Sequence, residues 1–155
     1  MAKDNNYKQG SFTPKNRNKY SGRYPIKFKS LLELKFCMYI DNNPSIVEWK
    51  YEPFSIPYIH PIDGKEHIYW PDFLLSIIPK DGSSYKALVE VKPFDLTPSS
   101  KSINKMNKRG GESANKFKTE LLVNAVKFKE GEIYCTKRGW KWLVLTERDI
   151  TSKGL

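Results

Sequence analysis

The chain has 155 residues, of which 39% are hydrophobic and 14% aromatic, a composition typical of one globular domain and unlike that of a disordered protein. No hydrophobic run approaches the ~20 residues that span a bilayer, and residues 1–23 are polar throughout, so we expect no membrane partner and no signal peptide. The net charge of +10, from 27 basic and 17 acidic residues, predicts a polyanionic partner, and DNA or RNA is the commonest one.

The two cysteines, Cys37 and Cys135, provide neither a disulfide framework nor zinc-ligand spacing. We expect both to be reduced thiols packed in the core.

Residues 1–25 show no amphipathic period and are rich in basic residues: Lys3, Lys8, Lys15, Arg17, Lys19 and Arg23. We predict a basic N-terminal arm here, lying on the protein surface or on DNA, followed by a single domain over residues 26–150. A tail without a function is the alternative. Its aromatic residues favour an arm that docks: Tyr7, Phe12, Tyr20 and Tyr24.

A helix is predicted from Ser30 to the breaker segment 41–44, with apolar residues recurring at helical spacing. Glu33 stands three residues after Ser30, which is the pattern of a capping box. Glu33 therefore has a purely structural explanation, and a functional role for it depends on other carboxylates.

Two short strands are predicted over residues 46–51 and 54–59, followed by a turn at Asp63-Gly64. Residues 65–70 then lead into the strand that carries Asp72. His60 and His67 have no third soft ligand at suitable spacing, so we do not expect a metal site there. We predict instead that His67 and Lys65 contact DNA phosphates.

Two β-rich segments, 69–75 and 88–93, flank a run of turn-forming residues at 79–84, which predicts a hairpin. Asp72 lies at the start of the first arm. Glu90 and Lys92 are two residues apart on the second arm, so their side chains point to one face while Val89 and Val91 face the other way. The hairpin would thus gather two carboxylates and an ammonium group at one end of a sheet.

The segment after Pro93 is predicted to be a basic loop that contacts the DNA backbone, although an ordinary solvated loop would look the same. Its basic residues are Lys101, Lys105, Lys108 and Arg109. A second helix is predicted after Ser113, with Gly131 as its C-terminal cap. Segments 132–135 and 141–145 are predicted as strands, with Trp140 and Trp142 covering the sheet or stacking on a base.

The predicted cluster suits phosphodiester hydrolysis, which requires charge neutralisation and an activated water. A hard cation such as Mg²⁺ prefers oxygen ligands. The expected ligands are Asp72, Glu90 and the backbone carbonyl of Val91, with Glu33 completing the shell. Lys92 would orient the attacking water and stabilise developing negative charge.

The order Glu33, Pro71-Asp72, Glu90-Val91-Lys92 resembles the PD-(D/E)XK nuclease superfamily. Further segments are similar to the head-completion nucleases of large tailed bacteriophages and to the end-cleaving endonuclease subunit of some transposons: Ser30–Phe36, Asp41–Pro44, Ile56–Tyr58, Asp63–Lys65, Tyr69–Phe73 and Val144–Glu147. Such families often have an aromatic residue before the helical glutamate, where this chain has Leu32.

The resemblance implies an α/β fold with a restriction-endonuclease-like core, in which helices flank a central mixed β-sheet. It implies a Mg²⁺-dependent DNA endonuclease, with Mn²⁺ as a possible substitute, acting in head completion after DNA packaging. The implied partners are DNA and phage head or portal proteins, and the implied location is the virion head or the host cytoplasm.

Two other functions fit the same pattern. The first is a structural head-completion or DNA-binding protein that has kept a nuclease fold without catalysis. The second is a cellular nuclease of transposition, restriction or recombination, which would need partner subunits or a recognition domain.

Overall fold

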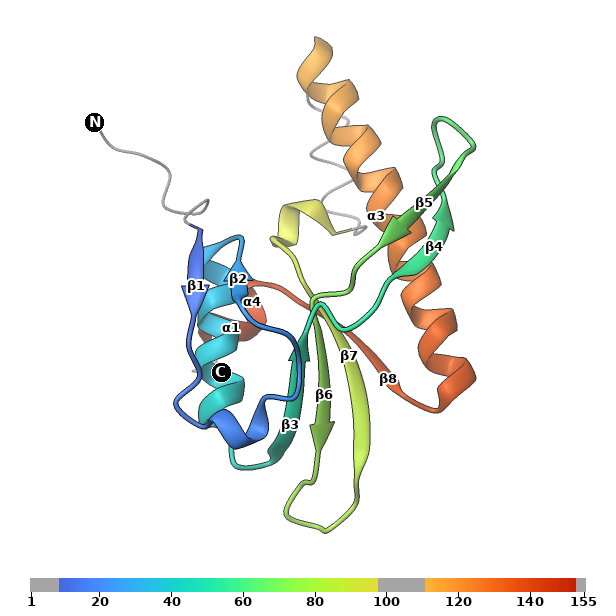
Figure 1. Ribbon diagram of the computed structural model, residues 1–155. Coiled ribbons are helices and arrows are strands. Elements are labelled where there is room, and N and C mark those ends of the chain that lie inside the picture. Colours follow the sequence, from blue (N-terminus) through green and yellow to red (C-terminus); the bar gives the residue numbers. More distant parts are fainter. Residues whose placement is uncertain (1–8, 98–110, 153–155) are drawn as a thin grey trace, which may run out of the picture.

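The computed structural model describes residues 9–97 and 111–152 (Figure 1). Its elements are β1 (Gly10–Phe12), the 3₁₀ turn η2 (Arg17–Lys19), β2 (Ile26–Phe28), α1 (Leu31–Asn42), β3 (Ile46–Tyr51), β4 (Ile56–Ile59), β5 (Glu66–Tyr69), β6 (Phe73–Ile77), β7 (Tyr85–Val91), the 3₁₀ turn η3 (Phe94–Leu96), α3 (Gly111–Arg138), β8 (Lys141–Leu145) and α4 (Glu147–Ser152).

The central sheet has the strand order β3-β6-β7-β8. The first three strands pair antiparallel, and β8 pairs parallel to β7 after the long crossover through α3. Two further two-stranded sheets, β1-β2 and β4-β5, lie outside it. The chain is therefore an α/β protein built on a mixed sheet, as the family resemblance implied.

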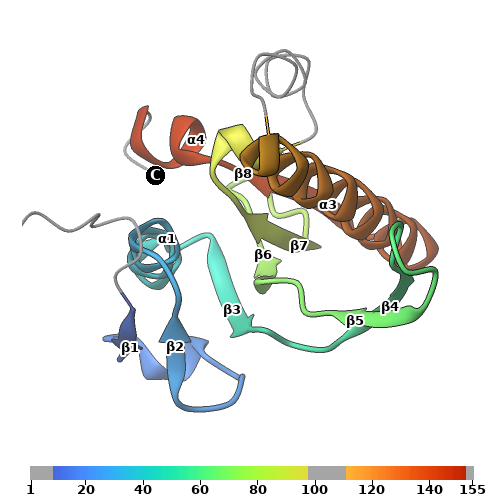
Figure 2. The ribbon, with the colours of Figure 1, turned by 90° about the horizontal axis from the view of Figure 1, so that it is seen from above.

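Helices cover both faces of this sheet (Figure 2). On one face, Phe36 of α1 packs with Trp49 of β3 and Phe73 of β6, and all three side chains are almost fully buried. On the other face, Leu74 of β6 and Leu88 of β7 pack with Cys135 of α3 and with the β4-β5 hairpin. Side chains that alternate along β6 and β7 thus supply two separate cores.

The predicted first helix is α1, and Ser30 is its N-cap: its Oγ accepts a hydrogen bond from the backbone N–H of Glu33 at 3.1 Å. The carboxylate of Glu33 does not return to Ser30. Its Oε1 instead accepts from the N–H of Lys29 at 3.3 Å, one residue earlier. The first hydrogen bond of the predicted capping box, from the Glu33 N–H to Ser30, is therefore present. The reciprocal bond to the Glu33 carboxylate comes from the N–H of Lys29 instead of Ser30.

The predicted hairpin is formed by β6 and β7, with Phe73 opposite Val89. Val89 and Val91 are buried in the core beside α1, as expected from their alternation with Glu90. The segment from 65 to 75 is not one strand, however. Tyr69 ends β5, which among the described strands pairs with β4 alone, and the strand of the central sheet begins at Phe73. Pro71 lies between the two strands, and proline has no N–H for a sheet ladder.

The prediction that the second helix ends at Gly131 is wrong, as is the strand predicted over 132–135. Helix α3 continues to Arg138. Gly131 lies inside this helix, where the Trp142 ring packs against it. A Cβ at this position would be 2.5 Å from atoms of that ring, so the close packing explains the glycine. The actual end is at Gly139, whose φ is +72°, with the N–H of Trp140 donating to the carbonyl of Cys135 at 2.9 Å. This is the hydrogen bonding of a Schellman cap.

The N-terminal segment that we predicted as an arm packs on the domain over the residues that the structure describes. Strand β1 pairs with β2 across the predicted boundary at residue 25. The ring of Tyr20 lies 4.6 Å from that of Trp49, edge to face. The carboxylate of Asp41 in α1 accepts hydrogen bonds from the backbone N–H groups of Lys15 and Asn16. Phe12 and Tyr20 thus dock this segment on Trp49 of the central sheet, whereas Tyr24 is exposed and Tyr7 lies outside the described residues.

Both cysteines are free and buried, as predicted. Among the described residues, no helix combines the length and the apolar character required to cross a bilayer.

Candidate active site

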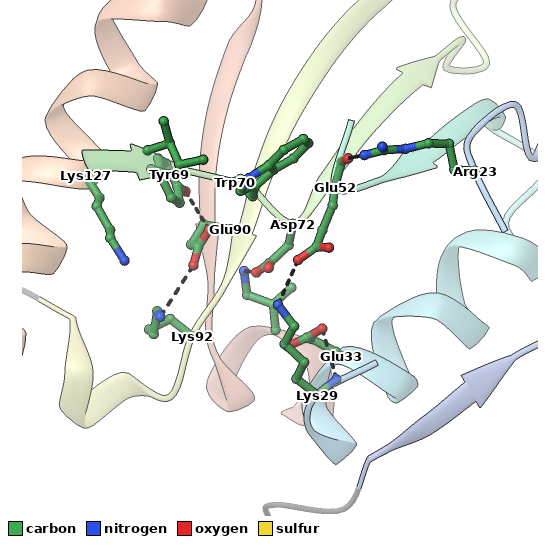
Figure 3. Close-up of a pocket in the computed structure, with 12 residues that line it drawn as sticks. Arg23, Lys29, Glu33, Glu52, Tyr69, Trp70, Asp72, Glu90, Lys92 and Lys127 are labelled. Atoms are coloured by element: carbon green, nitrogen blue, oxygen red, sulfur yellow. Dashed lines mark hydrogen bonds and ion pairs between the residues drawn. The ribbon is translucent and has the colours of Figure 1, made fainter. Parts of the chain in front are cut away.

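One pocket gathers side chains from elements that are far apart in the sequence (Figure 3). It is lined by Arg23, Lys29, Glu33, Glu52, Ile68, Tyr69, Trp70, Asp72, Glu90, Val91, Lys92 and Lys127. All four polar side chains that the sequence singled out as candidate catalytic groups are in this set.

Asp72 is placed by the turn that precedes β6, and Glu90 by the last part of β7. The Oδ2 atom of Asp72 accepts a hydrogen bond from the N–H of Val91 at 2.8 Å, which ties the two arms of the hairpin together. Glu90 is only 4% exposed, and its Oε1 accepts from the hydroxyl of Tyr69 at 2.5 Å. Its Oε2 lies 3.5 Å from Nζ of Lys92.

Glu33 reaches the same pocket from the first turn of α1 and is 8% exposed. Its Oε1 accepts from the hydroxyl of Tyr51 at 2.9 Å as well as from the N–H of Lys29. Glu33 therefore anchors the start of α1 and also lines the pocket, so the structural and functional explanations of this residue are compatible.

Burial makes all three carboxyl groups harder to ionise, and the neighbouring carboxylates add to this effect at Asp72. Burial, followed by the charges of Glu90 and Glu33, raises the pKa of Asp72 well above its usual value, against the opposing effects of the Val91 N–H and Lys92. Burial also raises the pKa of Glu90, although Lys92 and the Tyr69 hydroxyl oppose it. Burial raises the pKa of Glu33 in the same way, opposed by Tyr51.

This donor set suits a hard divalent cation. Within the described part of the chain, Oδ1 of Asp72 and Oε2 of Glu33 accept no hydrogen bond, while the opposite oxygen of each carboxylate is fixed by a donor. Oriented carboxylate oxygens that repel one another are what a cation such as Mg²⁺ would neutralise. Val91 lines the pocket beside them.

Several pocket residues were not among the predicted site residues. Lys29 pairs with Glu52 at 2.9 Å, and Arg23 Nη2 lies 3.5 Å from the Glu52 carbonyl oxygen. Glu52 has a φ of +44°, which is uncommon for a residue with a side chain, and its N–H donates to the carbonyl of Asp72 at 2.7 Å. Nothing in the local sequence around Arg23 or Glu52 marks them. Glu52 comes beside Asp72 because β3 pairs with β6, and Arg23 approaches through the docking of the N-terminal segment.

Lys127 comes from α3 and contributes an ammonium on the side opposite Lys29 (Figure 3). Its Nζ lies 5.7 Å from the ring centroids of Tyr58 and Tyr69. Burial lowers the pKa of Lys127, and the nearby Lys92 charge adds to this effect. In the sequence it is one lysine among several on a helix surface, so only the packing of α3 identifies it.

The predicted DNA contacts have a different placement. Lys65 and His67 lie on the β4-β5 hairpin and are not among the residues that line the pocket. The four basic residues of the predicted loop, Lys101, Lys105, Lys108 and Arg109, lie outside the described residues.

Comparison with known proteins supports the nuclease resemblance. A family model described as TnsA-like endonuclease N terminal matches residues 43–147. The chain is also 32% identical over 147 residues to the head completion nuclease of Enterobacteria phage T4, an alignment that covers 94% of this chain and 95% of that protein. Together with the helix-flanked mixed sheet, these matches confirm the predicted restriction-endonuclease-like fold.

Proposed function

Since the chain belongs to the TnsA-like endonuclease family, we propose that it is a metal-dependent DNA endonuclease that hydrolyses phosphodiester bonds. The observation that carries this proposal is the convergence of Glu33, Asp72, Glu90 and Lys92 on one pocket. These residues are separated by as many as 59 positions, from Glu33 to Lys92. They come from different elements, so their grouping is not the chance alignment of side chains along a single helix or strand.

Mg²⁺ is the proposed cofactor, with Mn²⁺ as a substitute. The residues that would hold it are Asp72, Glu90, the backbone carbonyl of Val91 and Glu33. When bound, such a cation neutralises phosphoryl oxygens and lowers the pKa of water. The protein contributes the fixed orientation of the ligands, through the Val91 N–H on Asp72 and the Tyr69 hydroxyl on Glu90.

Lys92 is proposed to act on the water and the phosphate. Its side chain is 23% exposed and is held 3.5 Å from Glu90, so the ammonium faces the pocket without being sealed from solvent. From there it would donate a hydrogen bond that orients the attacking water, and its positive charge would stabilise the negative charge that develops on the phosphoryl oxygens.

DNA would lie over the mouth of the pocket, with Arg23, Lys29 and Lys127 facing its phosphates. Further basic and histidine side chains, on the β4-β5 hairpin and in the basic segment after Pro93, are also proposed to contact DNA phosphates: Lys65, His67, Lys101, Lys105, Lys108 and Arg109. The net charge of +10 supports such a surface, and binding should weaken as salt concentration rises.

The biological role that we propose is head completion of a bacteriophage after DNA packaging. Its support is the T4 relative, whose name is head completion nuclease and which aligns with the chain over nearly its full length. The proposed partners are DNA and phage head or portal proteins, in the virion head or the host cytoplasm. Co-sedimentation of the protein with DNA-filled heads that lack their completion proteins would test this role.

The nuclease proposal is tested by incubating purified protein with supercoiled and branched DNA in Mg²⁺, in Mn²⁺ and in a chelator. Metal-dependent nicking that is lost in Asp72→Asn and kept in Asp81→Asn is expected, because Asp81 lies in the exposed β6–β7 turn. Protein that binds DNA but cuts none of these substrates with either metal would favour the non-catalytic alternative.

A further inference from the structure

The tip of the β4-β5 hairpin brings together three potential metal ligands. His60 follows β4, Asp63 lies in the turn and His67 is in β5. One ligand atom from each residue lies within 4.8 Å of the others. These are the two histidines of the entire chain, and their ring centroids are 4.6 Å apart. No metal site was predicted here because no third soft ligand has suitable spacing, and the folded turn supplies a carboxylate, that of Asp63, as the third group.

The hairpin holds these residues in place through its own backbone. The N–H of His60 donates to the carbonyl of Lys65 at 2.9 Å, and the N–H of Gly64 donates to the carbonyl of His60 at 2.9 Å. The N–H of Lys65 donates to Oδ1 of Asp63 at 2.8 Å, which fixes the carboxylate between the two rings. A site that is already formed requires little ordering when an ion binds.

The carboxylate of Asp63 faces both imidazoles. Its Oδ2 is 2.9 Å from Nε2 of His67, and its Oδ1 is 3.9 Å from Nδ1 of His60. The three side chains are 19% to 40% exposed, so an ion can reach them from solvent. Two imidazoles and one carboxylate are ligands that suit Zn²⁺ and similar transition metals, whereas Mg²⁺ prefers oxygen ligands alone.

We propose that His60, Asp63 and His67 form a transition-metal site, with Zn²⁺ as its expected ion, separate from the proposed Mg²⁺ site. A two-stranded hairpin by itself is at best marginally stable in water. Among the described elements, β4 contacts α3 closely while β5 has β4 as its strand partner. A metal that joins the two strands at the turn would fix β5, whose last residue, Tyr69, donates its hydroxyl to Glu90.

The test uses untagged protein carrying Asp72→Asn and Glu90→Gln, so that metal binding in the active-site pocket is suppressed. Imidazole ¹⁵N resonances are followed by NMR during a Zn²⁺ titration, and the chain gives only two imidazole spin systems. Both are expected to shift together and to saturate at one equivalent of Zn²⁺, in the presence of excess Mg²⁺. Thermal melting of the same protein should move to higher temperature with Zn²⁺.

Matched variants locate the site. Each ligand is removed in turn by His67→Asn, His60→Asn and Asp63→Ala. Removing a group that only hydrogen-bonds a metal ligand weakens metal binding by up to ~100-fold, so removing a ligand itself should weaken Zn²⁺ binding by more than ~100-fold. Asp81→Ala is the control, because Asp81 accepts the N–H of Ser83 in a turn of the same kind without histidines nearby. The proposal is overturned if binding needs a large excess of Zn²⁺, if only one imidazole responds, or if Asp63→Ala and Asp81→Ala behave alike.

Discussion

The hydroxyl of Tyr69, the last residue of β5, donates a hydrogen bond to Oε1 of Glu90 in β7. Tyr69 is 3% exposed and Glu90 4% exposed, so this hydrogen bond is shielded from solvent, while the other carboxylate oxygen of Glu90 faces Lys92. This bond links the hairpin outside the central sheet to the carboxylate in the proposed catalytic pocket. The hairpin therefore helps to determine the orientation of Glu90.

Tyr69→Phe should slow DNA cleavage and lower stability. The substitution removes the donor but keeps the ring, and a buried acceptor that loses its partner costs about 1–3 kcal/mol. Unfolding by denaturant and the nicking rate at saturating Mg²⁺ are the measurements. Tyr58→Phe, also in the hairpin, is the matched control, because among the described residues its hydroxyl makes no hydrogen bond to a site carboxylate. An equal loss of activity in both variants would argue against a positioning role.

Asp72→Asn should abolish metal-dependent nicking and leave the protein equally or more stable. The amide oxygen of asparagine can still accept the N–H of Val91, while the substitution removes a charge that burial and two neighbouring carboxylates disfavour.

Lys92→Ala should also abolish nicking, with Lys80→Ala in the exposed β6–β7 turn as its control. Melting temperatures and gel assays of supercoiled DNA provide the readouts, and full cleavage by both site variants would refute the assignment.

Glu33→Gln and Ser30→Ala separate the chemical and structural roles of the first turn of α1. Glutamine can keep the hydrogen bonds from Tyr51 and Lys29 through its carbonyl oxygen, so activity should fall while stability changes little. Ser30→Ala removes the N-cap and should cost about 1 kcal/mol of stability. Cleavage by the folded Ser30 variant should persist. The reverse pattern, stability lost and activity kept in Glu33→Gln, would show that Glu33 is only an anchor.

Gly131→Ala should destabilise the protein although alanine is the better helix former. Intrinsic propensity favours alanine by about 1 kcal/mol. The added Cβ would lie 2.5 Å from atoms of the Trp142 ring, and overpacking of this kind costs about 1–3 kcal/mol. Thermal or urea unfolding measures the balance. The double variant with Trp142→Leu should recover part of the loss, whereas additive effects would contradict a direct clash.

Both thiols should resist modification in the folded protein at about pH 8. Burial raises the pKa of Cys135 from 9.0 to about 11, and burial followed by the charge of Glu33 raises the pKa of Cys37 further. Because the folded-state pKa of Cys135 lies above its ordinary value of 9.0, the free energy of unfolding should fall as the pH rises from 9.0 to about 11. A thiol-reactive dye should label two cysteines in denaturant and neither without it. Rapid labelling of native protein would contradict the burial of these residues.

The local sequence was sufficient for the core of the candidate site. A turn between two β-rich segments places Asp72 opposite Glu90, and the period of two along a strand puts Glu90 and Lys92 on one face. Ser30 and the helical spacing after it likewise define α1. Such features depend on residues that are neighbours along the chain or across one tight turn, and backbone geometry alone brings them together.

Contacts between distant elements were decided only by the tertiary structure. Gly131 has the pattern of a helix end, but its role is to admit the ring of Trp142 from β8. Lys127 and Arg23 line the pocket because α3 and the N-terminal segment pack where they do, and Glu52 lines it because β3 pairs with β6. Asp63 lies between His60 and His67 because the hairpin turn folds back on itself. In each case the deciding neighbour is fixed by packing and burial, which a one-dimensional pattern of residue types does not encode.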